Sequence, residues 1–337
     1  MRHFTTIKDI AKKLGVSTST VSRALADRWD INPKTRELVL ETARAMNYKP
    51  NPMAVMLSKH QTKTIGIIIP EFYNSFFPTV IEGIQDVLQK TGHKLLIMQS
   101  KESMETERVN MEFLENCMVD GIILAITQEG ENVEQYRGLI ERSIPIVFIS
   151  RASMQVNAPR VMIDNYKMSF AAVEHLILTG RRHIAHISGP VSLNITGDRT
   201  KGYLDALAKY GLEEDRSLIV PGGMVLEGGY EAACTLLKSK RNIDAIFAFN
   251  DHAAIGAMRY LKEVGVSIPE DIAIVGFSES HSALVVEPRL TSVAQPLTEM
   301  GRKAAEIILK LIDNKKLPEM NVCLEAQLNI RESSFKI

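Results

Sequence analysis

Polar and charged side chains directly follow several apolar runs of this sequence, at positions where they could bind a small ligand. They are residues 71–77 after TIGIIIP, Ser150 and Arg151 after PIVFI, Asn250 and Asp251 after AIFAF, and Ser278 and Glu279 after IAIVGF. In open α/β sheets, ligands bind beyond the carboxyl ends of the strands. Each residue alone is more simply a helix cap or a loop residue, but together they predict a binding site.

The same segments carry a weak signal for hydrolysis. Residues 276–280, GFSES, follow a predicted strand and fall one glycine short of the G-x-S-x-G nucleophile elbow, with His252 and His281 as conceivable bases. Ser280 replaces the final glycine, and a basic helical segment at the N-terminus has no use in a hydrolase. We therefore predict no enzyme, and a hydrolase that uses Ser278 is the least favoured alternative.

Neither the histidines nor the cysteines are spaced as metal ligands. His183 and His186 lie three residues apart in a predicted strand, so their side chains point to opposite faces. The three cysteines are far apart in sequence and odd in number, which fits no metal cluster and no disulfide framework. The glycine cluster at 222–229 lacks a phosphate-loop pattern and is interpreted as a loop. We predict no metal and no cofactor.

A second polar face lies near the N-terminus, and its residue types suit contacts with DNA. Thr18, Ser19, Ser22 and Arg23 fall at i, i+1, i+4 and i+5 of a predicted helix and therefore share one face. Short hydroxyls and an arginine can reach base edges and phosphates in a major groove. The simpler interpretation is the solvated face of a small helical domain.

Two short predicted helices position this face. Thr6 and Asp9 resemble a capping box that opens the first helix, and Gly15 suits its left-handed end. Ser17, only two residues later, can cap the second helix. Two short helices joined by a tight glycine turn form a helix-turn-helix.

A third helix and a linker complete the N-terminal part. Asn32 and Pro33 give a cap and a first-turn proline, and the inner face of this helix is predicted on Leu38 and Ala45. Residues 47–52 are a linker by their two prolines. The helix that PMAVMLSKH can form after it is too short to be stable alone, so its order should depend on a partner.

From residue 64 onward, short apolar runs alternate with helical stretches. This pattern predicts parallel sheets covered by helices on both faces. More than 250 residues of it exceed one comfortable domain, so we expect two doubly wound lobes. The predicted fold is multidomain: a small all-α helix-turn-helix head plus an α/β two-lobed sensor.

The segments TIKDIAKKLGVSTSTVSRAL and NYKPNPMAVMLSKHQTKTIGIIIP resemble the LacI/GalR family of bacterial transcriptional regulators, and the resemblance continues to the C-terminus. It implies a head that reads the major groove, hinge helices of two subunits that fold together in the minor groove, and periplasmic-binding-protein-like lobes. The implied domains are a head at 1–50, a hinge helix and linker at 51–63, an N-terminal lobe at 64–163 and 295–322, and a C-terminal lobe at 164–294 and 323–337.

The resemblance also assigns DNA contacts. Thr18, Ser19 and Arg23 would read bases, Leu57 would be a wedge at the central base step, and Ala54 would pack beside it. The whole predicted DNA-contacting set is Thr6, Ser17, Thr18, Ser19, Thr20, Ser22, Arg23, Asn51, Ala54 and Leu57. Val55 stands where many members carry arginine, so a minor-groove contact from that position is not expected.

For the lobes, the resemblance implies that Phe76 and Phe77 flank a ligand, that Arg199 hydrogen-bonds it, and that Asn250 contacts it with Asp251 nearby. The whole predicted effector-binding set is Asn74, Phe76, Phe77, Ser150, Arg151, Arg199, Asn250, Asp251 and Ser278.

Two positions of this set depart from the sugar- and purine-binding relatives. Ser150 and Ser278 stand where those relatives place aspartates, whereas Arg151 and Arg199 are kept. The departure favours a more positive cleft and an anionic effector, a sugar acid or sugar phosphate more readily than a neutral sugar, because arginine binds such oxygens bidentately.

Charge is distributed very unevenly along the chain, although its 40 Lys and Arg balance its 40 Asp and Glu. Residues 1–63 hold 12 basic and 5 acidic residues, a net charge of +7, which leaves 28 and 35, or −7, for residues 64–337. The basic head suits phosphate binding, and the acidic body disfavours it.

We therefore predict a ligand-responsive, sequence-specific DNA-binding regulator, a repressor of carbohydrate utilisation genes, that binds a palindromic operator as a homodimer. A solute-binding receptor without a DNA role is the main alternative. No secretory signal peptide or membrane segment is indicated, which predicts a cytoplasmic protein.

Overall fold

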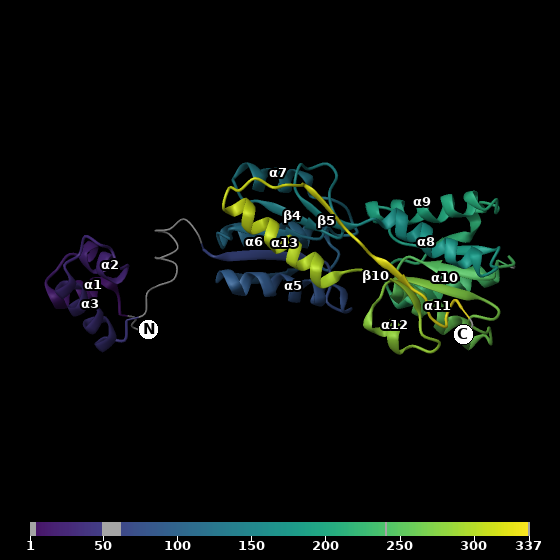
Figure 1. Ribbon diagram of the computed structural model, residues 1–337, viewed down its shortest axis with the longest axis horizontal. Helices are drawn as coiled ribbons and strands as arrows, with labels where there is room; N and C mark the ends of the chain where they lie inside the picture. The colour runs from purple at the N-terminus through teal and green to yellow at the C-terminus, as the bar shows by residue number, and fades with distance from the viewer. Residues whose placement is uncertain (1–4, 49–61, 240, 336–337) are drawn as a thin grey trace. The chain divides into compact units, whose positions relative to one another are not determined.

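The structure is a computed structural model that describes residues 5–48, 62–239 and 241–335 (Figure 1). The chain divides into two compact units, Met1–Thr62 and Lys63–Ile337. We call the first unit the head and the second unit the effector domain, and we describe each by itself.

The described part of the head contains three helices. They are α1 (Ile7–Leu14), α2 (Thr18–Leu25) and α3 (Pro33–Ala45). The capping box that was predicted for α1 is confirmed: Thr6 accepts from the Asp9 amide, and the Asp9 carboxylate accepts from the Thr6 amide at 2.8 Å. Gly15 ends α1 at φ 66°, and Ser17 caps α2 through the Thr20 amide, as the sequence predicted.

The core of the head is formed by one face of each helix. Its buried residues are Ile10, Ala11, Val21, Ala24, Val39 and Ala43. The predicted inner face of α3 was wrong, because Leu38 is 51% exposed and Ala45 is also exposed. The LVL run of α3 fits two helical faces in sequence, and packing against α1 and α2 selects the face of Val39, Thr42 and Ala43.

The turn between α2 and α3 carries the only tryptophan of the chain. Trp29 is 94% exposed, whereas Ile31 in the same turn packs on the head core. Ion pairs hold the turn at both of its ends: Asp30 pairs with Arg23 at 3.2 Å, and Asp27 pairs with Arg36 at 2.9 Å. The indole is therefore displayed on a fixed turn.

The effector domain has two lobes, each built on a six-stranded sheet in the described part of the chain. The strands of lobe 1, in sheet order, are β11 (Asn321–Leu324), β5 (Arg160–Ile163), β4 (Ile146–Ile149), β3 (Gly121–Leu124), β1 (Thr64–Ile69) and β2 (Lys94–Gln99). All pairs in this sheet are parallel. Its helices are α5 (Phe76–Thr91), α6 (Met104–Asn116), α7 (Val133–Glu141) and α13 (Leu297–Ile312).

Lobe 2 repeats this plan. Its strands, in sheet order, are β12 (Gln327–Asn329), β10 (Thr291–Ala294), β9 (Ala273–Ser278), β8 (Ala245–Ala248), β6 (Ile184–Ser188) and β7 (Ile219–Pro221). Only β12 is antiparallel to its neighbour among the described strands of this sheet. Its helices are α8 (Asn165–Leu178), α9 (Asn194–Lys209), α10 (Leu226–Lys238), α11 (Asp251–Glu263), α12 (His281–Val285) and a 3₁₀ turn, η1 (Arg216–Leu218).

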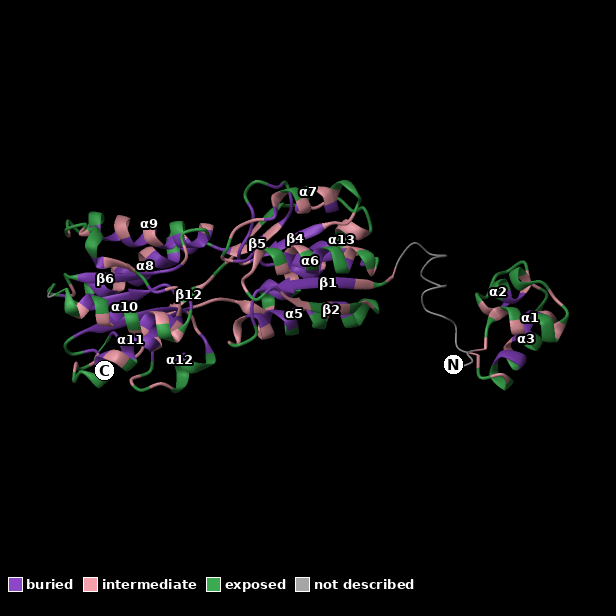
Figure 2. Ribbon diagram, turned by 180° about the vertical axis from the view of Figure 1, so that it is seen from behind, coloured by how far each residue is buried: buried purple, intermediate pink, exposed green. Residues whose placement is uncertain are grey.

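Both sheets are covered by helices on two faces, and Figure 2 shows the buried strands inside this cover. This arrangement confirms the predicted fold class of a helical head and two doubly wound α/β lobes. The chain passes between the lobes after β5, after β10 and after β11 (Figure 1). The last passage follows Leu324 and not residue 322, because Cys323 and Leu324 still pair with Met162 and Ile163 of β5.

Glycines let paired helices approach closely. A Cβ added at Gly301 of α13 would lie 2.0 Å from the Val80 carbonyl oxygen of α5, and one added at Gly83 of α5 would lie 2.0 Å from that of Thr298. Glycine is needed at these positions for packing, because alanine has the higher helix propensity and would otherwise be favoured.

Candidate functional site

One cavity between the two lobes is lined by the entire effector-binding set predicted from the sequence. Its mouth included, the cavity holds about 580 Å³. Lobe 1 contributes Asn74, Phe76, Phe77, Ser150 and Arg151, and lobe 2 contributes Arg199, Asn250, Asp251 and Ser278. Most of these residues follow parallel strands, whose carboxyl ends meet at one edge of each sheet.

Other lining residues were missing from that set. They are Glu71, Ser75, Ile195, Met224, Phe249, His252, Ser280, Gln295 and Leu297. Glu71 follows β1 like the predicted residues, and Phe249 directly precedes Asn250, so both had a signal in the sequence. Met224 belongs to the glycine cluster that we interpreted as a plain loop, and nothing in its sequence neighbourhood indicated the cavity.

Arg199 is a buried cation at the lobe 2 side of the cavity. The residue is 4% exposed, its guanidinium donates to Asn165 Oδ1 at 3.0 Å and to the Phe249 carbonyl at 2.5 Å, and its Cζ lies 3.6 Å from the Phe277 ring centroid. Burial lowers the pKa of Arg199 to about 9, which leaves it protonated at neutral pH. These partners are uncharged, so they do not neutralise its positive charge.

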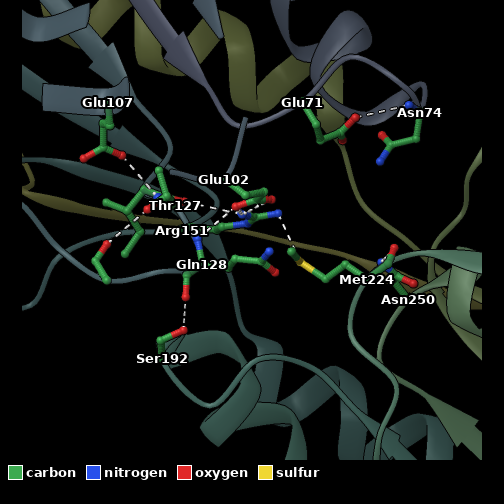
Figure 3. Close-up of polar contacts among 12 residues, drawn as sticks. Glu71, Asn74, Glu102, Glu107, Thr127, Gln128, Arg151, Ser192, Met224 and Asn250 are labelled. Atoms are coloured by element: carbon green, nitrogen blue, oxygen red, sulfur yellow. Dashed lines mark hydrogen bonds and ion pairs between the residues drawn. The ribbon is translucent and has the colours of Figure 1, made fainter. Parts of the chain in front are cut away.

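Arg151, on the lobe 1 side, is neutralised by a carboxylate that the sequence did not associate with it. Its Nη1 donates to the two carboxylate oxygens of Glu102 at 2.9 and 3.0 Å, and the two side chains are only 9% and 14% exposed (Figure 3). Its Nη2 donates to Met224 Sδ at 3.3 Å. Arg151 is therefore already engaged as the anchor of an ion pair.

Two acidic groups also line the cavity. Glu71 is 3% exposed, and Asp251 is fully buried. Burial raises the pKa of Glu71 and the pKa of Asp251. Glu102 pairs with Arg151, so of the two arginines only Arg199 has no carboxylate among its hydrogen-bond partners. The cleft is less positive than the two serines at 150 and 278 led us to expect.

Asp251 organises the turn that presents Ser278. Its carboxylate accepts from the Ser280 amide, and its Oδ1 accepts from Ser292 Oγ at 2.6 Å. Ser278 has φ 115°, an unfavourable conformation for a residue with a side chain, and its Oγ accepts from Gln295 Nε2 at 3.1 Å. The buried carboxylate thus holds a strained segment at the cavity wall.

The two asparagines of the cavity lining hydrogen-bond backbone amides at the starts of helices α11 and α5. Asn250 Oδ1 accepts from the Ala253 amide at 2.9 Å to cap α11, and its Nδ2 donates to the Met224 carbonyl at 2.9 Å. Asn74 Oδ1 accepts from the Phe76 amide at 2.8 Å. Their side chains are fixed by these bonds before any ligand arrives.

The weak hydrolase signal has no geometric support. Ser278 Oγ accepts a hydrogen bond from the Gln295 side-chain amide, and the His252 ring packs edge-on against Tyr73 with centroids 5.7 Å apart. Within the described residues, no group of three or more histidines, cysteines or carboxylates could hold a metal ion.

On the head, the predicted DNA-contacting side chains of α2 share an exposed face. Thr18, Ser19, Ser22 and Arg23 are exposed, whereas Ser17 and Thr20 hydrogen-bond to each other at the start of α2 at 2.8 Å. Thr6, the remaining member, caps α1. Asn51, Ala54 and Leu57 and the hinge segment 51–61 lie outside the described residues.

No described helix is both long enough and apolar enough to cross a membrane.

The chain is similar to bacterial regulators over nearly its whole length. It is 32% identical over 332 residues to the HTH-type transcriptional regulator RegA of Clostridium saccharobutylicum, which covers 98% of this chain and 99% of the relative. It is 30% identical to the HTH-type transcriptional repressor CytR of Escherichia coli K12, over 98% and 96% of the two chains. A solved transcriptional regulator CelR–cellobiose complex shares 29% identity at a TM-score of 0.76, over 98% of this chain and 99% of that one.

Two family models divide the chain as its two units do. Residues 6–51 match bacterial regulatory proteins of the lacI family. Residues 62–329 match the periplasmic binding proteins and sugar binding domain of the LacI family. The head matches a family of regulatory proteins, which opposes a solute receptor without a DNA role, and these relatives are named as a regulator and a repressor rather than as enzymes. The chain belongs to the LacI family of bacterial transcriptional regulators.

Proposed function

We propose that this regulator binds a palindromic operator as a homodimer and represses carbohydrate utilisation genes in response to a small sugar-type effector bound between its lobes. One observation carries the proposal. The same chain bears a polar, exposed recognition face on α2 and a cavity lined by residues from both lobes. Closing two lobes on a ligand is a recognised way to move the elements attached to them.

The effector chemistry follows from the lining. Arg199, Asn250 and Gln295 offer donors, Ser150 and Ser278 offer hydroxyls, and phenylalanines supply apolar walls. The hydroxyls of a sugar can hydrogen-bond to these polar groups, and its C–H face can pack against the phenylalanines. CelR, the relative solved with cellobiose, supports a sugar as the ligand class.

A neutral sugar now has better support than a sugar acid or phosphate. The charge of Arg151 is paired with Glu102, so one of the two arginines that favoured an anion is already neutralised. Calorimetry on the full chain should compare cellobiose, glucose and ribose with gluconate and glucose 6-phosphate. Tight binding of only the acids or phosphates would restore the anionic effector and overturn this assignment.

The DNA side of the proposal is tested by selecting bound duplexes from a random pool. We expect an inverted repeat, because a two-fold dimer presents two identical heads. Arg23→Ala should relax base preference at one position of each half-site by about 1–3 kcal/mol, whereas Lys12→Ala should weaken all sequences alike if Lys12 faces a phosphate. Selection of no symmetric sequence would contradict the proposed dimeric reading.

A homodimer is supported by apolar side chains that the effector domain leaves exposed. Ile97 lies on the edge strand β2, and Val109 and Phe113 lie one turn apart on the neighbouring helix α6. Exposed apolar groups on adjoining elements are typical of protein interfaces. We assign this surface to the contact between two copies of lobe 1.

A further inference from the structure

Two polar contacts join the lobes on the β3 and β4 side of the cavity, and the lobe 1 partner in each also hydrogen-bonds one carboxylate. Ser192 Oγ of lobe 2 donates to the Gln128 carbonyl of lobe 1, and Arg151 of lobe 1 donates to Met224 Sδ of lobe 2 at 3.3 Å (Figure 3). Glu102 accepts from the Gln128 amide at 2.8 Å and from Arg151 at 2.9 Å. Both lobe 1 partners are thus bound to Glu102.

The backbone around this carboxylate is held in an unfavourable conformation. Lys101 and Glu102 have φ values of 54° and 61°, and Ser150, which precedes Arg151, has φ 63°. Left-handed residues with side chains occur where surrounding contacts enforce them, and they cluster at functional sites. The turn after β2 is therefore shaped to deliver the Glu102 carboxylate to these two donors.

A second carboxylate, that of the buried Glu107, binds the loop that contains Gln128. Glu107 Oε2 accepts from the Thr127 amide at 3.2 Å, next to the Gln128 amide that Glu102 binds. Glu107 itself is held by Asn132 Nδ2 at 2.9 Å and Tyr136 Oη at 2.5 Å. Consecutive amides of one loop are fixed by two carboxylates, so the Gln128 carbonyl has a defined position for Ser192.

On the lobe 2 side, Met224 is hydrogen-bonded to the residue that caps helix α11. Asn250, which caps α11, donates to the Met224 carbonyl at 2.9 Å. Glu102, Arg151, Met224 and Asn250 form a continuous series of contacts from the turn after β2 to α11 (Figure 3).

We propose that Glu102 is a positioning residue for lobe closure, which acts through Arg151 and Gln128 and fixes the lobe 1 half of the contacts that hold this side of the cavity shut. The inference rests on the proposed effector-responsive function, because closure is the step by which an effector would act. Glu102 does not line the cavity, so its role is separate from ligand contact.

Hydrogen–deuterium exchange of the full chain, without DNA or effector, tests this role. Glu102→Gln keeps the shape of the side chain and removes its charge. We expect amides of residues 126–130 to exchange about tenfold faster, and amides of residues 190–196 and 222–226 in the other lobe to lose protection as well. A residue with only a local structural role would change the first segment alone, and that result would overturn the proposal.

The chain supplies matched controls. Glu105→Gln alters an exposed carboxylate that pairs with Arg108 on α6, and it should change none of these segments. The contacts on the β1 side, Tyr73 with His252 and Ser75 with the His281 amide, do not involve Glu102 and should keep their protection in every variant.

Ser192→Ala provides a test that leaves the Glu102 turn intact. It should raise exchange at residues 190–196, and the effect of the double variant there should be smaller than the sum of the two single effects. Additive effects would show that Glu102 and Ser192 act independently and would overturn the proposal. Because exchange needs neither operator nor effector, its outcome is separate from failure of the regulator to bind either one.

Discussion

At the scale of one residue, Arg199 offers a charge to a ligand and is also a buried part of lobe 2, and these two roles have opposing energetic demands. Its charge is available to a ligand only because its immediate partners are an amide oxygen, a backbone carbonyl and aromatic rings. The same partners bury it, and removing a charge from water costs stability. The residue that is best placed to bind an effector is also part of the framework of lobe 2.

Arg199→Ala should therefore cost stability as well as effector response. It leaves Asn165 Oδ1 and the Phe249 carbonyl unpaired, so we expect the free energy of unfolding to fall by about 2 kcal/mol or more. Urea unfolding measures the loss. Arg259→Ala, which removes an exposed surface pair with Glu263, should cost less than about 1 kcal/mol. Equal losses would contradict the framework role of Arg199.

Deprotonation of Glu107 should lower the stability of the effector domain as pH rises through mildly acidic values. Burial raises its pKa from 4.5 to about 6, so the folded state binds the proton more tightly than the unfolded state. The free energy of unfolding should fall by about 2 kcal/mol between about pH 4 and about pH 7 from this group, and stay level above that range. Urea unfolding of the native chain and Glu107→Gln at several pH values checks this, because a constant difference between them would contradict it.

Strand ends explain why individual cavity residues were predictable. Ser150, Asn250 and Ser278 each follow an apolar run, and parallel strands bring such positions to one edge. The partner of Arg151 was not predictable, because Glu102 lies 49 residues away and reaches it through a left-handed turn. Nor was Met224, since nothing marks a methionine in a glycine-rich loop as a neighbour of two distant side chains.

At the scale of elements, closely packed pairs of helices stabilise each lobe. α5 packs on α13, α8 on α9, and α10 on α11, and each pair meets at glycines that leave no room for a methyl group. The sequence predicted these segments as helices but gave no reason for their glycines. Short strands such as β5, β7 and β12 also escaped prediction, because three or four residues carry too little periodicity.

Gly301→Ala should force α13 away from α5. The added methyl group would overlap the Val80 carbonyl of α5, and overpacking of this kind costs about 1–3 kcal/mol. Gly197→Ala in α9 meets nothing within 4 Å, so helix propensity alone should raise stability by up to about 1 kcal/mol. Thermal unfolding compares the two variants, and equal shifts in Tm would refute close packing at Gly301.

At the scale of the whole molecule, the chain separates its charges between units with different partners. The head segment carries +7 and the remainder −7, although the total is zero. Attraction to phosphates is thereby concentrated in the head and should fall steeply as salt increases. In the dimer that we propose, the acidic effector domain instead contributes surface for a second copy of the chain.

Phe113→Arg should dissociate the proposed homodimer. Placing a charge among Ile97, Val109 and the partner surface removes apolar contact, so the sedimenting species should shift from twice 37.6 kDa towards 37.6 kDa. Operator affinity should fall with it, because one head alone binds one half-site. Leu178→Arg, a change at an exposed leucine of α8, is the matched control and should remain dimeric. A dimeric Phe113→Arg would place the interface elsewhere.

The exposed turn of the head gives this chain a built-in optical probe. Trp29 is its only tryptophan, so the effector domain contributes no indole emission. Any change in tryptophan fluorescence when operator is added originates at the head. A change caused by a sugar alone would mean that a signal from the lobes had reached the head, and the unlabelled native protein could report it in real time.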